Sequence, residues 1–129
     1  MTDTLLTVHG LNTGYGAVQV LFDVAFGVRA GTVTTLVGAN GAGKSTIMKT
    51  LAGLVAPRAG SLLYDGREIV GLASHERVDA GLCLIPEGRL VFPGMTVEQN
   101  LRLGAVSPKA RSGHEEMLAE VYRRFPRLQ

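Results

Sequence analysis

The feature that most constrains this chain is the segment from Gly38 to Ser45, which reads Gly-Ala-Asn-Gly-Ala-Gly-Lys-Ser. Two glycines five positions apart, followed by a lysine and a hydroxyl residue, are typical of a phosphate-binding loop between a strand and a helix. Both neighbours are predicted here. The β-branched residues 32–37 favour a strand covered on both faces, and the apolar spacing after Ser45 is that of an amphipathic helix, which Pro57 and Gly60 end. The fold class is therefore α/β.

The residue types in this loop match the needs of a polyphosphate. Glycine lets backbone N–H groups approach phosphate oxygens closely, and the start of the following helix points further N–H groups at the anion. The lysine supplies positive charge for the β- and γ-phosphates, and the serine hydroxyl is placed to ligate Mg²⁺. These features predict a purine nucleoside triphosphate with Mg²⁺ and do not separate ATP from GTP. The expected binding residues are Gly38, Asn40, Gly41, Ala42, Gly43, Lys44, Ser45 (also a metal ligand) and Thr46.

The remaining elements follow from periodicity and turn residues. Residues 5–11 and 20–28 are predicted strands, and Asp65-Gly66 predicts a hairpin between residues 61–64 and 67–70. Ser74 is expected to cap a short helix that ends near Gly81, and residues 82–85 are expected to form a buried strand. The alternation in the second strand predicts that one set of side chains faces the core: Val20, Phe22, Val24, Phe26 and Val28.

The second half of the chain is predicted to be helical. Thr96 and Gln99 have the spacing of a capping box, which predicts a helix from Val97 to about Leu103. Residues 107–113 are expected to be a connector, and residues 117–125 carry the apolar face of a last helix that Pro126 closes. Phe92, Met95 and Val97 fit either contact with a partner or packing in a core.

Composition excludes several classes of protein. The 129 residues are 46% hydrophobic and 19% charged, which is typical of a globular domain, and a formal charge of +2 is too small to favour a nucleic-acid partner. The chain has no apolar run long enough to span a membrane and no export signal at its start, so we expect a cytoplasmic protein. Its one cysteine, Cys83, is expected to be a small core residue. No histidine has the spacing of a metal ligand, and no catalytic residue is assigned.

Several motifs together resemble those of the ATP-binding-cassette (ABC) ATPases. They are Gly38 to Thr46, Leu51-Ala52-Gly53-Leu54, Gly60 to Gly66, and Ile85 to Leu101 with its Pro-Glu-Gly start. The resemblance implies that Tyr15 stacks on adenine, which selects ATP, although an ordinary turn tyrosine also fits the position. Most cassettes have glutamine where this chain has Glu87, and the glutamate is typical of the importers of branched-chain amino acids. The resemblance implies a contact of Glu87 with Mg²⁺ or water; a solvated loop carboxylate is the alternative.

The resemblance also implies a domain plan. Residues 1–106 correspond to the N-terminal part of the ABC ATPase core with its antiparallel β subdomain, and residues 107–129 to the start of a helical subdomain that is incomplete at the C-terminus. The family's Leu-Ser-Gly-Gly signature, Asp-Glu strand and later histidine do not occur in the sequence; residues 62–65 and 111–115 echo them only superficially. We therefore expect an N-terminal piece of a cassette that binds Mg·ATP but hydrolyses it negligibly.

The implied function is that of the ATP-binding subunit of an ABC importer for branched-chain amino acids. Such a subunit is peripheral on the inner face of the cell membrane, and its partners are integral-membrane permease subunits and a second ABC ATPase subunit. It touches neither nucleic acid nor the transported substrate. Two alternatives remain: a soluble non-transport ABC ATPase, which the segment from Phe92 to Thr96 argues against, and a nucleotide-binding fragment without a function of its own.

Overall fold

The computed structural model describes residues 4–88 and 90–129, which form two compact units that divide after Leu84. The expected division between residues 106 and 107 concerns a larger fold and stays a prediction. The first unit contains β1 (Thr4–Tyr15), β2 (Val18–Arg29), α1 (Lys44–Leu51), β3 (Ala59–Tyr64), β4 (Arg67–Glu68) and α2 (Ser74–Ala80). The second contains α3 (Val97–Leu103), α4 (Pro108–Arg111), α5 (His114–Arg124) and the 3-10 turn η1 (Pro126–Leu128).

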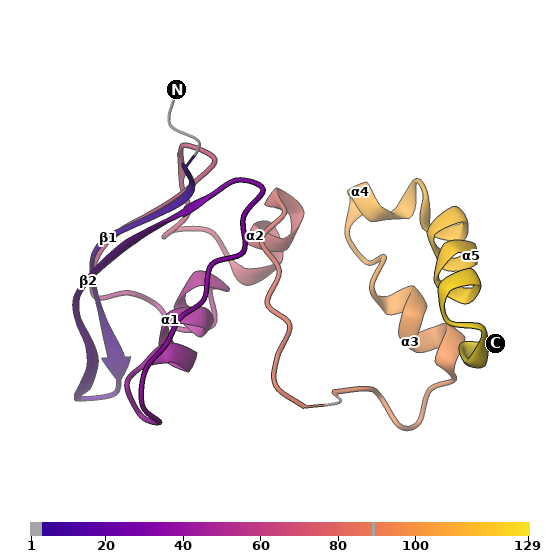
Figure 1. The fold of residues 1–129 in the computed structure, drawn as a ribbon, viewed down its shortest axis with the longest axis horizontal. Helices are drawn as coiled ribbons and strands as arrows, with labels where there is room; N and C mark the ends of the chain where they lie inside the picture. Colours follow the sequence, from indigo (N-terminus) through magenta and orange to yellow (C-terminus); the bar gives the residue numbers. More distant parts are fainter. Residues whose placement is uncertain (1–3, 89) are drawn as a thin grey trace. The chain divides into compact units, whose positions relative to one another are not determined.

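The first unit is built on a four-stranded sheet with the order β2-β1-β3-β4, in which every neighbouring pair is antiparallel. Figure 1 shows β1 and β2 as two long neighbouring strands, with α1 beside the sheet. The antiparallel β subdomain and the α/β fold class are thereby confirmed. The core between the sheet and the helix consists of Leu6, Val8, Leu11, Leu21, Ile47, Leu51, Leu62 and Ile69.

The predicted core face of β2 is wrong at Phe22, whose side chain is 68% exposed. The pairing shifts by one residue between Leu21 and Val24, and Asp23 there has a positive φ of 47°. An extra residue in one strand exchanges its two faces, because side chains alternate along a strand. Leu21 is therefore buried before the bulge, while Val24 and the later members of the predicted set pack against the core after it.

The hairpin turn is confirmed, and two neighbouring boundaries are corrected. Asp65 and Gly66 both have positive φ, at 48° and 74°, as a two-residue turn of the primed type requires. β4 nevertheless ends at Glu68, two residues earlier than predicted. The N-cap of α2 is Ala73 rather than Ser74, and the Glu76 carboxylate accepts the Ala73 N–H at 2.7 Å.

Helix α1 is shorter than its apolar spacing predicts. It begins at Lys44 and ends at Leu51, and Leu54 lies outside it with 61% of its surface exposed. Gly53 follows the C-cap with a φ of 76°, and a left-handed residue at this point ends a helix. The stop signal is therefore Gly53 rather than Pro57.

Two predicted strands are absent from the described residues. Residues 32–39 and 82–86 carry no strand assignment, and Figure 1 shows the first stretch as a loop between β2 and α1. Val33 and Ile85 are 97% and 89% exposed, and Cys83 is exposed rather than part of the core. A strand needs a neighbour to satisfy its backbone groups, and in the described part of the chain neither segment pairs with one.

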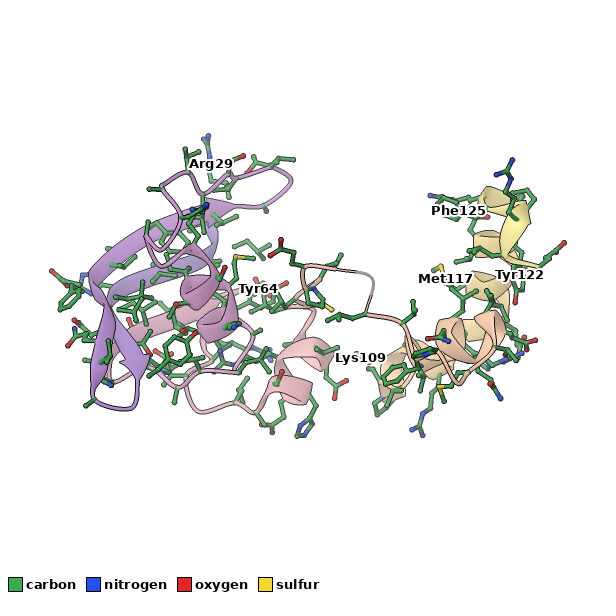
Figure 2. All side chains as sticks on the ribbon, turned by 90° about the horizontal axis from the view of Figure 1, so that it is seen from below. Arg29, Tyr64, Lys109, Met117, Tyr122 and Phe125 are labelled. Carbon is green, nitrogen blue, oxygen red and sulfur yellow. The ribbon has the colours of Figure 1, made fainter. Side chains whose placement is uncertain are left out.

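The second unit confirms the predicted capping box. The Thr96 hydroxyl accepts the Gln99 N–H at 3.2 Å, and the Gln99 side chain accepts the Thr96 N–H at 2.9 Å. The predicted connector contains α4, so it is not wholly irregular. In Figure 2 Met117, Tyr122 and Phe125 project from the last helical segment; Tyr122 is half-buried and the other two are exposed. Among the described helices, none has the length and apolar character needed to cross a bilayer.

Candidate phosphate-binding site

The predicted phosphate loop lies directly against β2. Gly43 is buried, has a φ of 94°, and leaves so little room that an added Cβ would lie 2.6 Å from Leu21 Cδ2 and 3.6 Å from Val20 Cγ1. Gly41 has a φ of 84° with open space around it. Only glycine adopts such conformations without strain. The glycines therefore allow the backbone conformation of the loop, and the contact between Gly43 and Leu21 places the loop against β2.

The loop ends at an open helix N-terminus. Gly43 is the N-cap of α1, no described side chain caps this end, and the first turn contains no acidic residue. The first N–H groups of a helix have no intrahelical partner, and the helix dipole makes this end equivalent to about half a positive charge. The N–H groups of Lys44, Ser45 and Thr46 are thus available to an anion.

The Lys44 ammonium folds back over the loop. Its Nζ donates to Gly38 O at 2.6 Å and to Ala39 O at 2.7 Å. Both carbonyls are exposed to solvent, so these bonds exchange readily for stronger bonds between the ammonium and charged oxygens. The Lys44 ammonium therefore already lies beside the loop in which it would neutralise phosphate charge.

The other predicted loop residues lie around the same bend. Asn40 and Ala42 are exposed, and the Ala42 N–H donates to Ala39 O at 3.1 Å, which closes a tight turn. Ser45 is exposed at the first turn of α1, whereas Thr46 beside it is only 6% exposed. An exposed serine hydroxyl next to open N–H groups fits Mg²⁺, which prefers oxygen ligands and retains its waters. The described residues contain no cluster of three His, Cys, Asp or Glu that would hold a metal by itself.

Tyr15 comes from a different part of the chain and reaches the same helix end. It is the last residue of β1, it is 47% exposed, and its hydroxyl lies 3.5 Å from Thr46 Oγ1. The strand thus brings an aromatic ring to the N-terminal turn of α1. An exposed ring beside a phosphate-binding loop is suited to stack on a base.

Glu87 belongs to the second unit, where it lies exposed in the loop before α3. The phosphate loop belongs to the first unit, and each unit has its own structure. The predicted contact of Glu87 with Mg²⁺ stays a prediction.

A cluster of charged side chains in the second unit joins α3 to α5. Arg102 donates to Glu98 at 2.7 Å and to Glu115 at 2.7 Å, and His114 Nε2 lies 2.9 Å from the Glu115 carboxylate. The hydrogen bond from Arg102 holds the pKa of Glu115 below its ordinary value of 4.5. The same two carboxylates raise the pKa of Arg102. Glu98 and Glu115 are exposed and Arg102 and His114 are half-buried, so these ion pairs connect α3 with α5 at the surface and contribute little to stability.

The second unit also contains an apolar cavity of about 400 Å³. Its lining comes from the end of α3 and the residues after it, from α4 and the residues after it, and from α5: Leu101, Arg102, Gly104, Ala105, Lys109, Ala110, Ser112, Gly113, His114, Met117, Leu118 and Val121. Its lining side chains Arg102, Ser112 and His114 take part in hydrogen bonds within the second unit. The candidate site therefore remains the phosphate loop of the first unit.

Sequence reasoning assigned no role to Arg77, which the structure buries to 2% exposure in contact with the C-terminal end of α1. Burial lowers the pKa of its guanidinium, and the nearby Glu68 carboxylate acts in the opposite direction. Nothing in the local sequence separates this arginine from the solvated charges around it.

Comparison with known proteins identifies a family. The sequence profile of the family described as ABC transporter matches residues 21–128. The chain is 40% identical over 124 residues to the high-affinity branched-chain amino acid transport ATP-binding protein BraG of Pseudomonas aeruginosa, covering 96% of this chain and 53% of the relative. It is 39% identical over 101 residues to the probable branched-chain amino acid transport ATP-binding protein LivF of Archaeoglobus fulgidus, covering 78% and 43%.

A solved structure described as the ATP binding subunit of an ABC transporter superposes with a TM-score of 0.72 at 34% identity. The superposition covers 95% of this chain and 50% of that one. The chain thus spans about half the length of these two relatives and of this solved structure.

Proposed function

The chain belongs to the ABC transporter family, and from that premise we propose that it binds Mg·ATP as part of the ATP-binding subunit of an importer of branched-chain amino acids. One observation carries the proposal: the uncapped N-terminus of α1, entered through Gly43, with the Lys44 ammonium held 2.6 Å from the loop carbonyl of Gly38. This arrangement offers N–H donors and a cation to a polyphosphate. The names of the two relatives support the substrate class.

Within the loop, each residue has a proposed role. Backbone N–H groups of residues 38–46 hold the phosphates, Lys44 neutralises the β- and γ-phosphates, and Ser45 holds the ion. When bound, Mg²⁺ neutralises phosphate charge. Tyr15 supplies the adenine platform, and its hydroxyl contact with Thr46 keeps the ring beside the α-phosphate end of the loop.

The proposal extends to the partners of the complete protein. Phe92, Met95 and Val97 are 58%, 41% and 47% exposed. This exposure favours contact with a partner over core packing, and we assign the partner as a permease subunit at the inner face of the membrane. A second ABC ATPase subunit would supply the missing signature, and Glu87 would contact Mg²⁺ or water. The transported amino acid would meet the permease rather than this chain.

We also propose that the 129-residue chain alone binds ATP without appreciable turnover. The sequence contains no Asp-Glu pair after an apolar strand and no Leu-Ser-Gly-Gly segment. Without a carboxylate to orient the attacking water, ATP hydrolysis is slow and the complex with intact Mg·ATP accumulates.

Thermal or urea unfolding with and without Mg·ATP tests nucleotide binding. At 100 times the dissociation constant, a ligand that binds only the folded chain adds about 2.7 kcal/mol to the free energy of unfolding. Lys44→Ala should abolish this gain. Lys49→Ala, which removes an exposed lysine from the same helix, should retain it. A folded wild-type chain that gains no stability from Mg·ATP refutes the proposal.

A further inference from the structure

The buried guanidinium of Arg77 binds the C-terminal end of α1, the end opposite the phosphate loop. Arg77 is 2% exposed, and its Nη1 donates to Thr50 O at 2.7 Å and to Leu51 O at 2.9 Å. These carbonyls belong to the last turn of α1, where a cation is favourable, and Thr50 O also accepts the Gly53 N–H at 3.1 Å. Arg77 therefore closes this helix end from outside the helix.

The same guanidinium holds the loop between β4 and α2. Its Nε donates to Leu72 O and its Nη2 to Val70 O, both at 3.1 Å. The backbone carbonyl of Arg77 in turn accepts the Leu82 N–H at 2.9 Å, at the start of the stretch that leads to Glu87. Arg77 is thus the point at which α1, this loop and the chain beyond α2 are tied together.

The backbone beside Arg77 is shaped to admit it. Gly53 has a φ of 76°, and a Cβ added there would lie 3.0 Å from Arg77 Nε and 3.3 Å from its Cζ. Gly53 belongs to the Leu-Ala-Gly-Leu motif that the phosphate loop does not use. The positive φ favours glycine, and the absence of a Cβ leaves room for the guanidinium, which gives this part of the motif a physical explanation.

Arginine is suited to orient this helix rather than merely to fill space. Whole buried ion pairs can often be replaced by apolar side chains of similar volume without loss of stability, so a buried charge is not by itself evidence of a role in stability. A planar guanidinium with donors in fixed directions sets both the position and the rotation of the carbonyls it binds. Two of its four directional bonds go to α1 and two to the loop before α2, so the guanidinium fixes the end of α1, which is eight residues or about 12 Å long, relative to that loop.

We propose that Arg77 is a positioning residue for the phosphate loop, which holds α1 by its C-terminal carbonyls so that the N–H groups of Lys44, Ser45 and Thr46 stay aimed at the phosphates. The inference rests on the proposed binding of Mg·ATP. α1 is only eight residues long, so a displacement of its carbonyls at Thr50 reaches the N-terminal turn, where burial of Thr46 and Ile47 and the contact of Gly43 with Leu21 hold the helix against the sheet. Nucleotide affinity then depends on a side chain that touches no nucleotide.

The test compares Arg77→Ala with Arg67→Ala in the 129-residue chain. Arg67 is an exposed arginine of the same unit and serves as the matched control. We expect Arg77→Ala to weaken Mg·ATP binding, measured by calorimetry on the folded protein, about tenfold, which corresponds to 1.4 kcal/mol. Arg67→Ala should leave the dissociation constant unchanged. Millimolar methylguanidinium should restore affinity to Arg77→Ala, whereas methylammonium at the same concentration should not.

A purely structural role predicts a different result. A folded Arg77→Ala chain, with a cooperative melt, that binds Mg·ATP within about twofold of wild type overturns the inference. If Arg77→Ala does not fold, the wild-type chain decides by NMR: on titration with Mg·ATP, the Arg77 Nε–H resonance should shift with the same dissociation constant as the Gly43 amide. An unmoved Arg77 signal beside a shifting Gly43 amide overturns the inference while leaving nucleotide binding intact. A folded wild-type chain that binds no Mg·ATP overturns both.

Discussion

Gly43→Ala should destabilise the chain more than Gly41→Ala, although both glycines have similar positive φ values of 94° and 84°. A side chain in such a conformation costs about 1–3 kcal/mol at either position. At Gly41 a new Cβ meets nothing within 4 Å, whereas at Gly43 it lies 2.6 Å from Leu21 Cδ2. Leu21 is 2% exposed and cannot swing into solvent, so overpacking adds about 1–3 kcal/mol at Gly43 alone.

Urea unfolding of the two single variants measures this difference directly. We expect Gly41→Ala to cost about 1–3 kcal/mol and Gly43→Ala about 2–6 kcal/mol, the sum of the conformational and packing costs. A difference between the two variants smaller than about 0.5 kcal/mol lies within the error of additivity and refutes the reasoning.

A third variant assigns the extra cost to Leu21. In a Leu21→Ala background the clash is removed, so adding Gly43→Ala should cost no more than Gly41→Ala does in the wild type. The double-mutant cycle then yields a favourable coupling energy of about 1–3 kcal/mol between the two substitutions. No coupling would mean that the loop does not rest on β2 as described.

Two further predictions concern the second unit. Thr96→Ala removes the hydroxyl that accepts the Gln99 N–H and should destabilise α3 by about 0.5–2 kcal/mol, measured by urea unfolding, while Glu98→Ala on the exposed side of the first turn should cost less. Glu115→Gln should destabilise the chain at neutral pH and by less at pH 3, because the folded-state pKa of Glu115 is lowered. Its stabilisation is complete above the ordinary value of 4.5 and declines as the pH falls towards the lowered pKa. A Glu115→Gln effect of equal size at both pH values contradicts this assignment to the ion pair with Arg102.

The parts of the fold that the sequence predicted correctly are those whose cause is local. The Asp65-Gly66 turn needs only two residues that tolerate positive φ, and the capping box at Thr96 and Gln99 needs only a spacing of three. The boundaries of both features follow from bonds made within a few residues. Local chemistry is therefore sufficient to predict them.

The errors occur where the cause lies elsewhere in the chain. Residues 32–37 have strong strand preferences, but a strand forms by pairing, and among the described residues these have no neighbouring strand. The prediction that Phe22 faces the core is wrong for a related reason. The bulge at Asp23 belongs to the register of β2 against β1, and the alternation of residues within β2 carries no information about that register. Both errors follow from treating a property of two strands as a property of one.

The candidate site divides in the same way. Residues 38–46 could be found from sequence because one bend of contiguous backbone makes the whole anion-binding surface. The residues that hold this bend in place could not be found from sequence. Leu21, which contacts Gly43, and Arg77, which donates to Thr50 O, lie far from the motif in sequence and resemble ordinary core and surface residues. Phosphate affinity depends on the orientation of the N–H groups as much as on their presence. Substitutions at these two supports should therefore separate the presence of the motif from its function, which no change within the motif itself can do.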